Sequence, residues 1–181
     1  MHETDSMVME FSVPKTLESE IEELITHYPE KRSVALMALH SLQSHFGYVS
    51  DAGIEWIAQK LGQTPLAVLE LVTFYPMFSR EPLGKFHFRI CRTLSCALNG
   101  SEKIYWALCE QLGLDKNVHS RQTTPDGRFT VEFVECLACC DKGPVLFLNE
   151  DLHENVTEES VAKLLTICNG DDSSTRKGSG K

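Results

Sequence analysis

Residues 89–96 read Arg-Ile-Cys-Arg-Thr-Leu-Ser-Cys, and residues 134–144 read Val-Glu-Cys-Leu-Ala-Cys-Cys-Asp-Lys-Gly-Pro. Both segments carry cysteines at the point where a strand-like run ends, so each predicts a cysteine-bearing loop at the carboxyl end of a strand. Two such loops on neighbouring strands can bring four thiolates around one inorganic centre. Iron–sulfur clusters and structural zinc are the centres that four cysteines usually hold.

The spacing of these cysteines leaves the metal and one ligand open. Cys91 and Cys96 are separated by four residues, while Cys136 is followed by both Cys139 and Cys140. Four thiolates can hold a [2Fe–2S] cluster with two sulfurs on each iron. Zinc pairs more often have two intervening residues, but up to four occur. Residue chemistry alone therefore decides neither between iron–sulfur and zinc nor between Cys139 and Cys140.

The second half of the chain alternates strand-like and helical segments in a thioredoxin-like order. Two strands joined through a helix form a parallel pair, and a hairpin and a covering helix come after them. The expected elements are strands over 85–91, 129–135, 145–148 and 152–156, a loop over 91–99, a helix from Gly100 to Gly113, a polar connection over 114–128, and a last helix capped by Thr157.

Four short amphipathic helices are expected before this region, because apolar residues recur there at helical spacing. The last of them runs into an aromatic exit at Phe74-Tyr75. Their expected bounds are 15–27, from residue 32 or 33 to Gly47, from the cap Ser50 to Gly62, and from the cap Thr64-Pro65 to the aromatic exit.

The texture of the sequence changes at residues 79–84, a mostly polar stretch that contains Pro82 and Gly84. This change predicts a boundary between subdomains. The tail lacks an apolar anchor, which is typical of disorder. The expected organisation is a mobile lead over 1–14, in which Phe11 and Val13 can pack onto the helices after it, a helical subdomain over 15–79, a thioredoxin-like domain over 85–168, and a disordered tail over 169–181.

Composition and charge narrow the class of protein. With 42% hydrophobic and 24% charged residues, the chain has the composition of a soluble globular protein. Its net charge of -9 argues against nucleic-acid binding. The apolar runs are too short for membrane insertion, and the N-terminus does not resemble a signal peptide. We therefore expect a reducing, cytoplasmic compartment, where clustered cysteines usually bind metal; Cys109 and Cys168, within expected helices, are predicted to be buried core residues.

Three motifs carry a resemblance to a known family. They are Cys91-x4-Cys96, the run Thr-Pro-Asp-Gly-Arg-Phe at 124–129, and Cys136-Leu-x-x-Cys140-Asp-Lys-Gly-Pro. Over about residues 15–168 the sequence resembles the NuoE family, the small thioredoxin-like [2Fe–2S] subunit of NADH:quinone oxidoreductase. The cluster ligands that this resemblance implies are Cys91, Cys96, Cys136 and Cys140. One departure is visible: many members carry glycine at the position of Ala138 and a small non-cysteine residue at that of Cys139.

The resemblance also implies a fold and a function. The fold is α/β, with a thioredoxin-like [2Fe–2S] ferredoxin domain preceded by a small helical bundle. The function is electron transfer, in which one [2Fe–2S] cluster exchanges electrons with the flavin of a partner subunit. Because the sequence has no dinucleotide fingerprint, FMN and NADH are expected on that flavin- and NAD-binding partner. The chain would thus be part of an NADH dehydrogenase, on the peripheral arm of a membrane-associated complex, without an independent catalytic site.

Three alternatives remain open. Related subunits occur in NAD-linked hydrogenases and formate dehydrogenases, where the chain would belong to the diaphorase module. A zinc-stabilised interaction module would use the same cysteines without redox chemistry. A thiol oxidoreductase would use Cys136 and Cys139, but such pairs usually follow the first strand at a helix N-terminus, so this alternative ranks last.

Overall fold

The computed structural model describes residues 11–170. The chain divides into two compact units, Met1–Pro82 and Leu83–Lys181. The predicted mobile lead and disordered tail fall largely on residues 1–10 and 171–181, which lie outside the described residues. Each unit has a hydrophobic core of its own.

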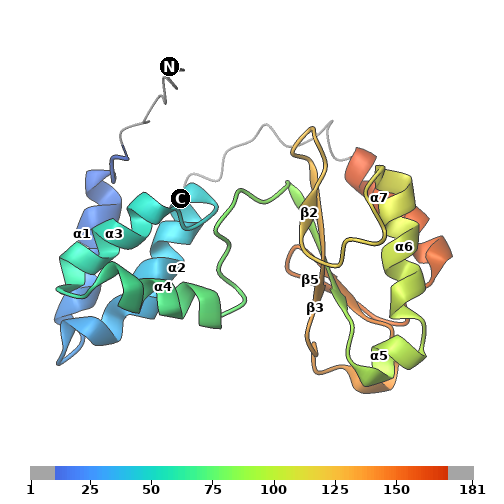
Figure 1. The fold of residues 1–181 in the computed structure, drawn as a ribbon, viewed down its shortest axis with the longest axis horizontal. Coiled ribbons are helices and arrows are strands. Elements are labelled where there is room, and N and C mark those ends of the chain that lie inside the picture. Colours follow the sequence, from blue (N-terminus) through green and yellow to red (C-terminus); the bar gives the residue numbers. More distant parts are fainter. Residues whose placement is uncertain (1–10, 171–181) are drawn as a thin grey trace, which may run out of the picture. The chain divides into compact units, whose positions relative to one another are not determined.

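The first unit is helical (Figure 1). All four helices that the sequence predicts are present, and Phe11 and Val13 pack against their core, as expected. Ser50 caps the third helix by accepting a hydrogen bond from the backbone N–H of Gly53. The elements are α1 (Lys15–Thr26), the 3₁₀ turn η1 (Lys31–Val34), α2 (Ala35–Phe46), α3 (Asp51–Leu61) and α4 (Pro65–Phe74).

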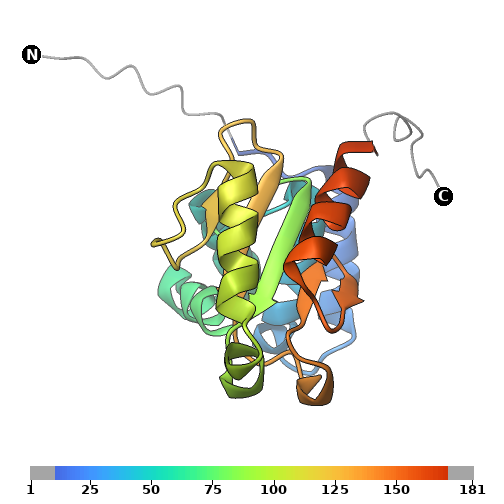
Figure 2. The same ribbon diagram turned by 90° about the vertical axis from the view of Figure 1, so that its right-hand side faces the viewer.

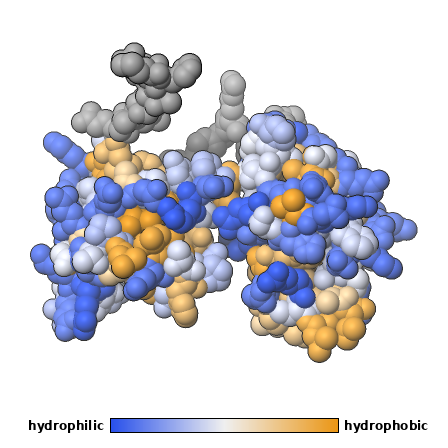
Figure 3. Space-filling model, in the orientation of Figure 1, coloured by the Kyte–Doolittle hydropathy of each residue, from blue (hydrophilic) through white to orange (hydrophobic). Residues whose placement is uncertain are grey.

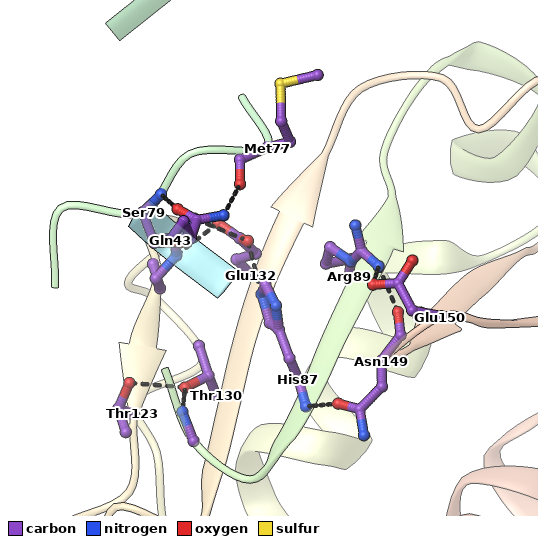
Figure 4. Close-up of polar contacts among 12 residues, drawn as sticks. Gln43, Met77, Ser79, His87, Arg89, Thr123, Thr130, Glu132, Asn149 and Glu150 are labelled. Carbon is purple, nitrogen blue, oxygen red and sulfur yellow. Dashed lines mark hydrogen bonds and ion pairs between the residues drawn. The ribbon is translucent and has the colours of Figure 1, made fainter. Parts of the chain in front are cut away.

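One side chain ties the end of this unit to its interior. Gln43 of α2 donates a hydrogen bond to the carbonyl oxygen of Met77 and accepts one from the backbone N–H of Ser79 (Figure 4). Pro76 prevents α4 from continuing as a regular helix, because proline lacks the N–H that the helix needs. The Gln43 amide therefore satisfies backbone groups that lie just beyond the helix end.

The second unit is an α/β domain in which α6 and α7 cover one face of a five-stranded sheet (Figure 2). The strand order is β2-β3-β1-β4-β5. The β1 and β3 strands are parallel and β4 and β5 form an antiparallel hairpin, as predicted. The β1–β4 and β2–β3 pairs are also antiparallel. The elements are β1 (Phe86–Cys91), α5 (Leu94–Leu98), α6 (Ser101–Leu112), β2 (Gln122–Thr123), β3 (Phe129–Val134), the turn η2 (Cys140–Lys142), β4 (Leu146–Leu148), β5 (Asp151–His153) and α7 (Glu158–Gly170).

Several details differ from the sequence prediction. The segment expected to be a loop contains the short helix α5, and the polar connection contains β2. Two residues are too few for β2 to show alternation, and it forms because the 124–127 turn folds it back onto β3. The β5 strand begins one residue before the predicted range and ends at His153. Helix α7 reaches Gly170, two residues into the range predicted to be disordered.

The sheet has an apolar face and a polar face. Phe86, Phe88 and Ile90 alternate inward from β1 and are buried in the core. Cys109 of α6 and Cys168 of α7 are buried in the same core, as predicted. The core thus lies between the sheet and the two helices that cover it.

The polar face carries a half-buried charge network. His87 and Glu132 point toward each other from neighbouring strands, with Nε2 of His87 2.7 Å from Oε1 of Glu132 (Figure 4). Arg121 holds the same carboxylate, with Nε 3.0 Å from Oε2. Burial works to raise the pKa of Glu132, but the hydrogen bonds from His87 and Arg121 outweigh it and hold that pKa below its usual 4.5.

The first prediction concerns this network. Because the pKa of Glu132 is lower in the folded than in the unfolded chain, its carboxylate stabilises the fold above pH 4.5, and the contribution is lost as the pH falls. Glu132→Gln should lower the free energy of unfolding by on the order of 1 kcal/mol at neutral pH. The difference from wild type should shrink toward pH ~3.

Fluorescence of Trp106, which lies in α6, would report unfolding of this unit in a Trp56→Phe background. Glu150→Gln is the matched control, because Glu150 is 96% exposed and its pair with Arg89 is long, at 3.4 Å. A loss in Glu132→Gln that does not change with pH would contradict the assignment of the effect to the carboxylate charge.

Candidate metal centre

The parallel pairing of β1 with β3 brings the two cysteine segments together. Cys91 is the last residue of β1 and stands opposite Val134, the last residue of β3. The backbone N–H of Arg92 donates to the carbonyl oxygen of Val134 at 3.0 Å, so the pairing continues into the loop. Cys136 comes two residues later. Both loops therefore leave the same edge of the sheet, as the sequence predicts.

Helix α5 turns Cys96 back toward Cys91. Cys91 and Cys96 are each 1% exposed and pack with Val145 in a small cluster separate from the main core. Gly143 of the second loop lies directly against this cysteine, since a Cβ there would stand 3.3 Å from Sγ of Cys96. Ser95 donates a hydrogen bond to a backbone carbonyl of the second loop at 2.6 Å. The short helix thus locks the two cysteine loops together.

Cys136 and Cys140 form an exposed pair. Their sulfurs lie 3.6 Å apart. Two thiolates about 2.3 Å from one tetrahedral metal ion would be separated by about 3.8 Å. The spacing of this pair therefore fits two ligands of one metal ion.

The first pair is electrostatically linked to the second loop. Burial works to raise the pKa of the Cys91 thiol, but hydrogen bonds from Thr93 and from the backbone of Leu137 outweigh it and lower that pKa. Burial raises the pKa of Cys96, and the neighbouring Cys91 and Cys140 add to the rise. Cys91 is thus the member of this pair that ionises more readily.

The second pair shows the same division. The backbone N–H of Ala138, 3.3 Å from Sγ of Cys136, is the largest cause of the lowered pKa of that thiol. The pKa of Cys140 is raised, chiefly by its hydrogen bond to Cys136. In each pair, one thiol therefore has a pKa below its ordinary value. Nearby N–H donors stabilise negative charge on its sulfur.

Cys139 has a different environment. Its side chain packs against the cluster formed by Cys91, Cys96 and Val145. Its thiol contacts Oε1 of Glu154 at 3.5 Å, and burial, followed by this carboxylate, raises its pKa. Glu154 in turn binds Lys142, with Nζ 2.9 Å from Oε2. The Cys139 thiol is thus stabilised in its neutral form.

The donor set fits a binuclear centre better than a single ion. The structure places Cys136 and Cys140 3.6 Å apart on one loop, and Cys91 and Cys96 on the adjoining loop. Structural zinc needs four ligands around one ion. A [2Fe–2S] cluster needs two ligands on each of two irons, and two cysteine pairs on adjoining loops supply that arrangement.

The backbone at Ala138 explains a feature of the sequence. Ala138 has a φ of 59°, in the left-handed region that glycine enters at lower cost. This conformation aims its N–H at the Cys136 sulfur. The glycine that many NuoE members carry at this position therefore matches a conformational demand of the loop.

Sequence reasoning missed three contributors to the site. Ser95 joins the two loops, and Thr93 places its hydroxyl 3.2 Å from Sγ of Cys91. Both are small hydroxyl residues between Cys91 and Cys96, so their position in the sequence could have marked them as candidates for contacts with the site. Glu154 holds Cys139 and Lys142 from beyond β5, and no local pattern marks it.

A thioredoxin-like domain with cysteine pairs on the loops after two adjoining parallel strands defines the class of iron–sulfur ferredoxins built on this fold. The chain belongs to the thioredoxin-like [2Fe–2S] ferredoxin family, whose model matches residues 21–169. One [2Fe–2S] cluster is the cofactor of that family. The expected family and fold class are thus confirmed.

Named relatives agree with the family. The chain is 39% identical over 150 residues to an E subunit of the NADH-quinone oxidoreductase of Rhizobium meliloti, covering 83% of this chain and 87% of the relative. It is 36% identical over 166 residues to the E subunit of the same oxidoreductase of Escherichia coli K12, covering 91% of this chain and 98% of the relative.

A solved structure agrees with the fold. An NAD⁺-reducing [NiFe]-hydrogenase in the air-oxidised state matches with a TM-score of 0.65 at 17% identity. The match covers 76% of this chain and 23% of that chain. Within residues 11–170, the helices are too short or too polar to cross a membrane.

The second prediction tests the strained loop. Ala138→Gly should raise the free energy of unfolding by up to about 1 kcal/mol, because glycine adopts the left-handed conformation without a Cβ clash. Ala107→Gly, within helix α6, is the matched control and should lower it by about 1 kcal/mol. Denaturant unfolding followed by Trp106 fluorescence measures both. If Ala138→Gly lowered the free energy of unfolding, the left-handed conformation of Ala138 would not be a source of strain.

Proposed function

We propose that this chain is the electron-transfer subunit of an NADH:quinone oxidoreductase and that Cys91, Cys96, Cys136 and Cys140 hold its [2Fe–2S] cluster. The observation that carries the proposal is the meeting of two cysteine loops at one edge of the sheet, with the second pair of sulfurs 3.6 Å apart. The names of the curated relatives support the choice of complex.

The residues around the site would perform distinct tasks. The cluster, when bound, supplies one-electron redox chemistry. Cys91 and Cys96 hold it from the buried side, while Cys136 and Cys140 hold it from the exposed side. The N–H of Ala138 stabilises negative charge on sulfur, and the packing of Gly143 against Cys96 limits access of water.

An apolar surface beside the cysteines favours a protein partner. Leu94 and Leu98 of α5 are 75% and 79% exposed, on either side of the buried Cys96. Figure 3 shows an orange patch at the end of the α/β unit where Figure 1 places α5. Exposed apolar groups beside a redox site are typical of a contact surface. We infer that the flavin- and NADH-binding subunit docks here, on the cytoplasmic peripheral arm of the complex.

The rival functions make different demands on the site. A zinc module would need four sulfurs around one ion, whereas two pairs on adjoining loops match the two ligands that each iron of a [2Fe–2S] cluster needs. A thiol oxidoreductase would pair Cys136 with Cys139, but the sulfur of Cys136 meets Cys140, while that of Cys139 meets Glu154. The diaphorase module of an NAD-linked hydrogenase or formate dehydrogenase differs only in its partner, so it remains the second candidate.

The third prediction concerns the centre and its ligands. Protein purified without oxygen should contain about two irons and two sulfides per chain. Cys140→Ser should lose the cluster or strongly alter it, while Cys139→Ser, the matched control next to it, should retain it. Iron and sulfide analysis with optical spectra measures both. Stoichiometric zinc without iron would contradict the proposed centre, and reversed behaviour of the two variants would contradict the ligand set.

The fourth prediction concerns the partner. Co-expression with a flavin- and NAD-binding subunit should give a complex that survives purification, as judged by native mass spectrometry. Replacing Leu94 and Leu98 together with serine should weaken that complex at least tenfold without loss of iron, because both side chains face solvent in the free chain. Replacing the exposed Ile167 of α7 with serine is the control. Unchanged affinity in the double variant would exclude α5 as the docking surface.

A further inference from the structure

Thr93 stands at the N-cap of α5 but does not cap it. Threonine is a common N-cap because its hydroxyl accepts a hydrogen bond from a backbone N–H in the first turn. Thr93 makes no such side-chain bond, and the first turn is closed by its carbonyl oxygen, which accepts from the N–H of Ala97 at 2.9 Å. The hydroxyl is therefore available for another purpose.

That hydroxyl is directed at sulfur. Oγ1 of Thr93 lies 3.2 Å from Sγ of Cys91, a hydrogen-bonding distance for oxygen and sulfur. Cys91 is almost fully buried, so little water competes for its lone pairs. A metal-bound thiolate only accepts hydrogen bonds, so the hydroxyl of Thr93 must be the donor when Cys91 is a ligand.

We propose that the Thr93 hydroxyl donates a hydrogen bond to the Cys91 thiolate and thereby raises the reduction potential of the bound cluster. The proposal rests on the proposed function, in which Cys91 is a ligand. Reduction adds one negative charge to the cluster, and a donor at a ligand sulfur stabilises the reduced form more than the oxidised form. Thr93 is thus a tuning residue that acts through Cys91, and the same hydroxyl also hydrogen-bonds Cys136 of the second pair.

Other donors near the cysteines are backbone N–H groups, which side-chain substitution does not remove; those of Thr93 itself and of Val145 reach Cys91 and Cys96. The N–H of Ala138 lies 3.3 Å from Sγ of Cys136, and a backbone hydrogen bond from Leu137 reaches Cys91. A change of the Thr93 side chain leaves all these backbone groups in place. The effect of the hydroxyl can therefore be measured separately.

The experiment is a spectroscopic redox titration of the iron-loaded chain, with three variants. Thr93→Val removes the hydroxyl and keeps the shape, Thr93→Ser keeps the hydroxyl, and Thr166→Val makes the same chemical change on α7, where the hydroxyl bonds a backbone carbonyl. Thr93→Val should disfavour reduction by up to about tenfold, the size of one hydrogen bond, which is about 59 mV for a one-electron couple. Thr93→Ser and Thr166→Val should titrate like wild type.

A second readout locates the proton itself. Electron–nuclear double resonance on the reduced cluster should show an exchangeable proton coupling that disappears in Thr93→Val and persists in Thr93→Ser. Equal midpoints in wild type and Thr93→Val would overturn the inference while leaving the ligand set intact. If Thr93→Val does not retain iron, Thr93→Ala is titrated instead, under the same criterion. A wild-type chain without iron would overturn the proposed function and this inference together.

Discussion

The parallel pairing of β1 with β3 is the constraint on which the rest of the site depends. It places Cys91 opposite Val134 and so starts both cysteine loops from adjacent points at one sheet edge. A shift of this register by one residue would turn every side chain of β1 to the other face. Phe86, Phe88 and Ile90 would then leave the core, so hydrophobic burial of the strand also sets the position of the first cysteine.

The loops add constraints that strand pairing alone does not supply. The second loop passes Ala138 in a left-handed conformation and then brings Gly143 against the Cys96 sulfur. The first loop uses Thr93 and Ser95 to reach sulfur and backbone instead of capping its own helix. One of the three non-glycine residues with positive φ in the described part of the chain, Ala138, thus lies between the cysteines of the second loop, and functional sites often carry such backbone cost.

Much of this arrangement could be predicted from the sequence, and the remainder has identifiable physical causes. Alternation marks β1 and β3, and helical periodicity with caps such as Ser50 marks the longer helices. Helix α5 could not be predicted, because five residues are too few to show a helical period and its leucines face outward. The contact between Cys139 and Glu154, which bears on the proposed choice between Cys139 and Cys140, could not be predicted because Glu154 is brought near only by the fold.

The two cysteine pairs differ in exposure, and this difference gives the proposed site a direction. Cys91 and Cys96 are buried against Val145, whereas Cys136 and Cys140 are exposed. A partner could therefore approach the second pair closely but would meet the first pair only through protein. The leucines on the outward face of α5 lie beside the same loops. A partner that docks from the exposed side would therefore bury apolar surface and also shorten the distance from its own redox group to the cysteine sulfurs. The Thr93 hydroxyl contacts the buried Cys91 and also hydrogen-bonds the exposed Cys136, so on this assignment it would act on the potential from between the two pairs.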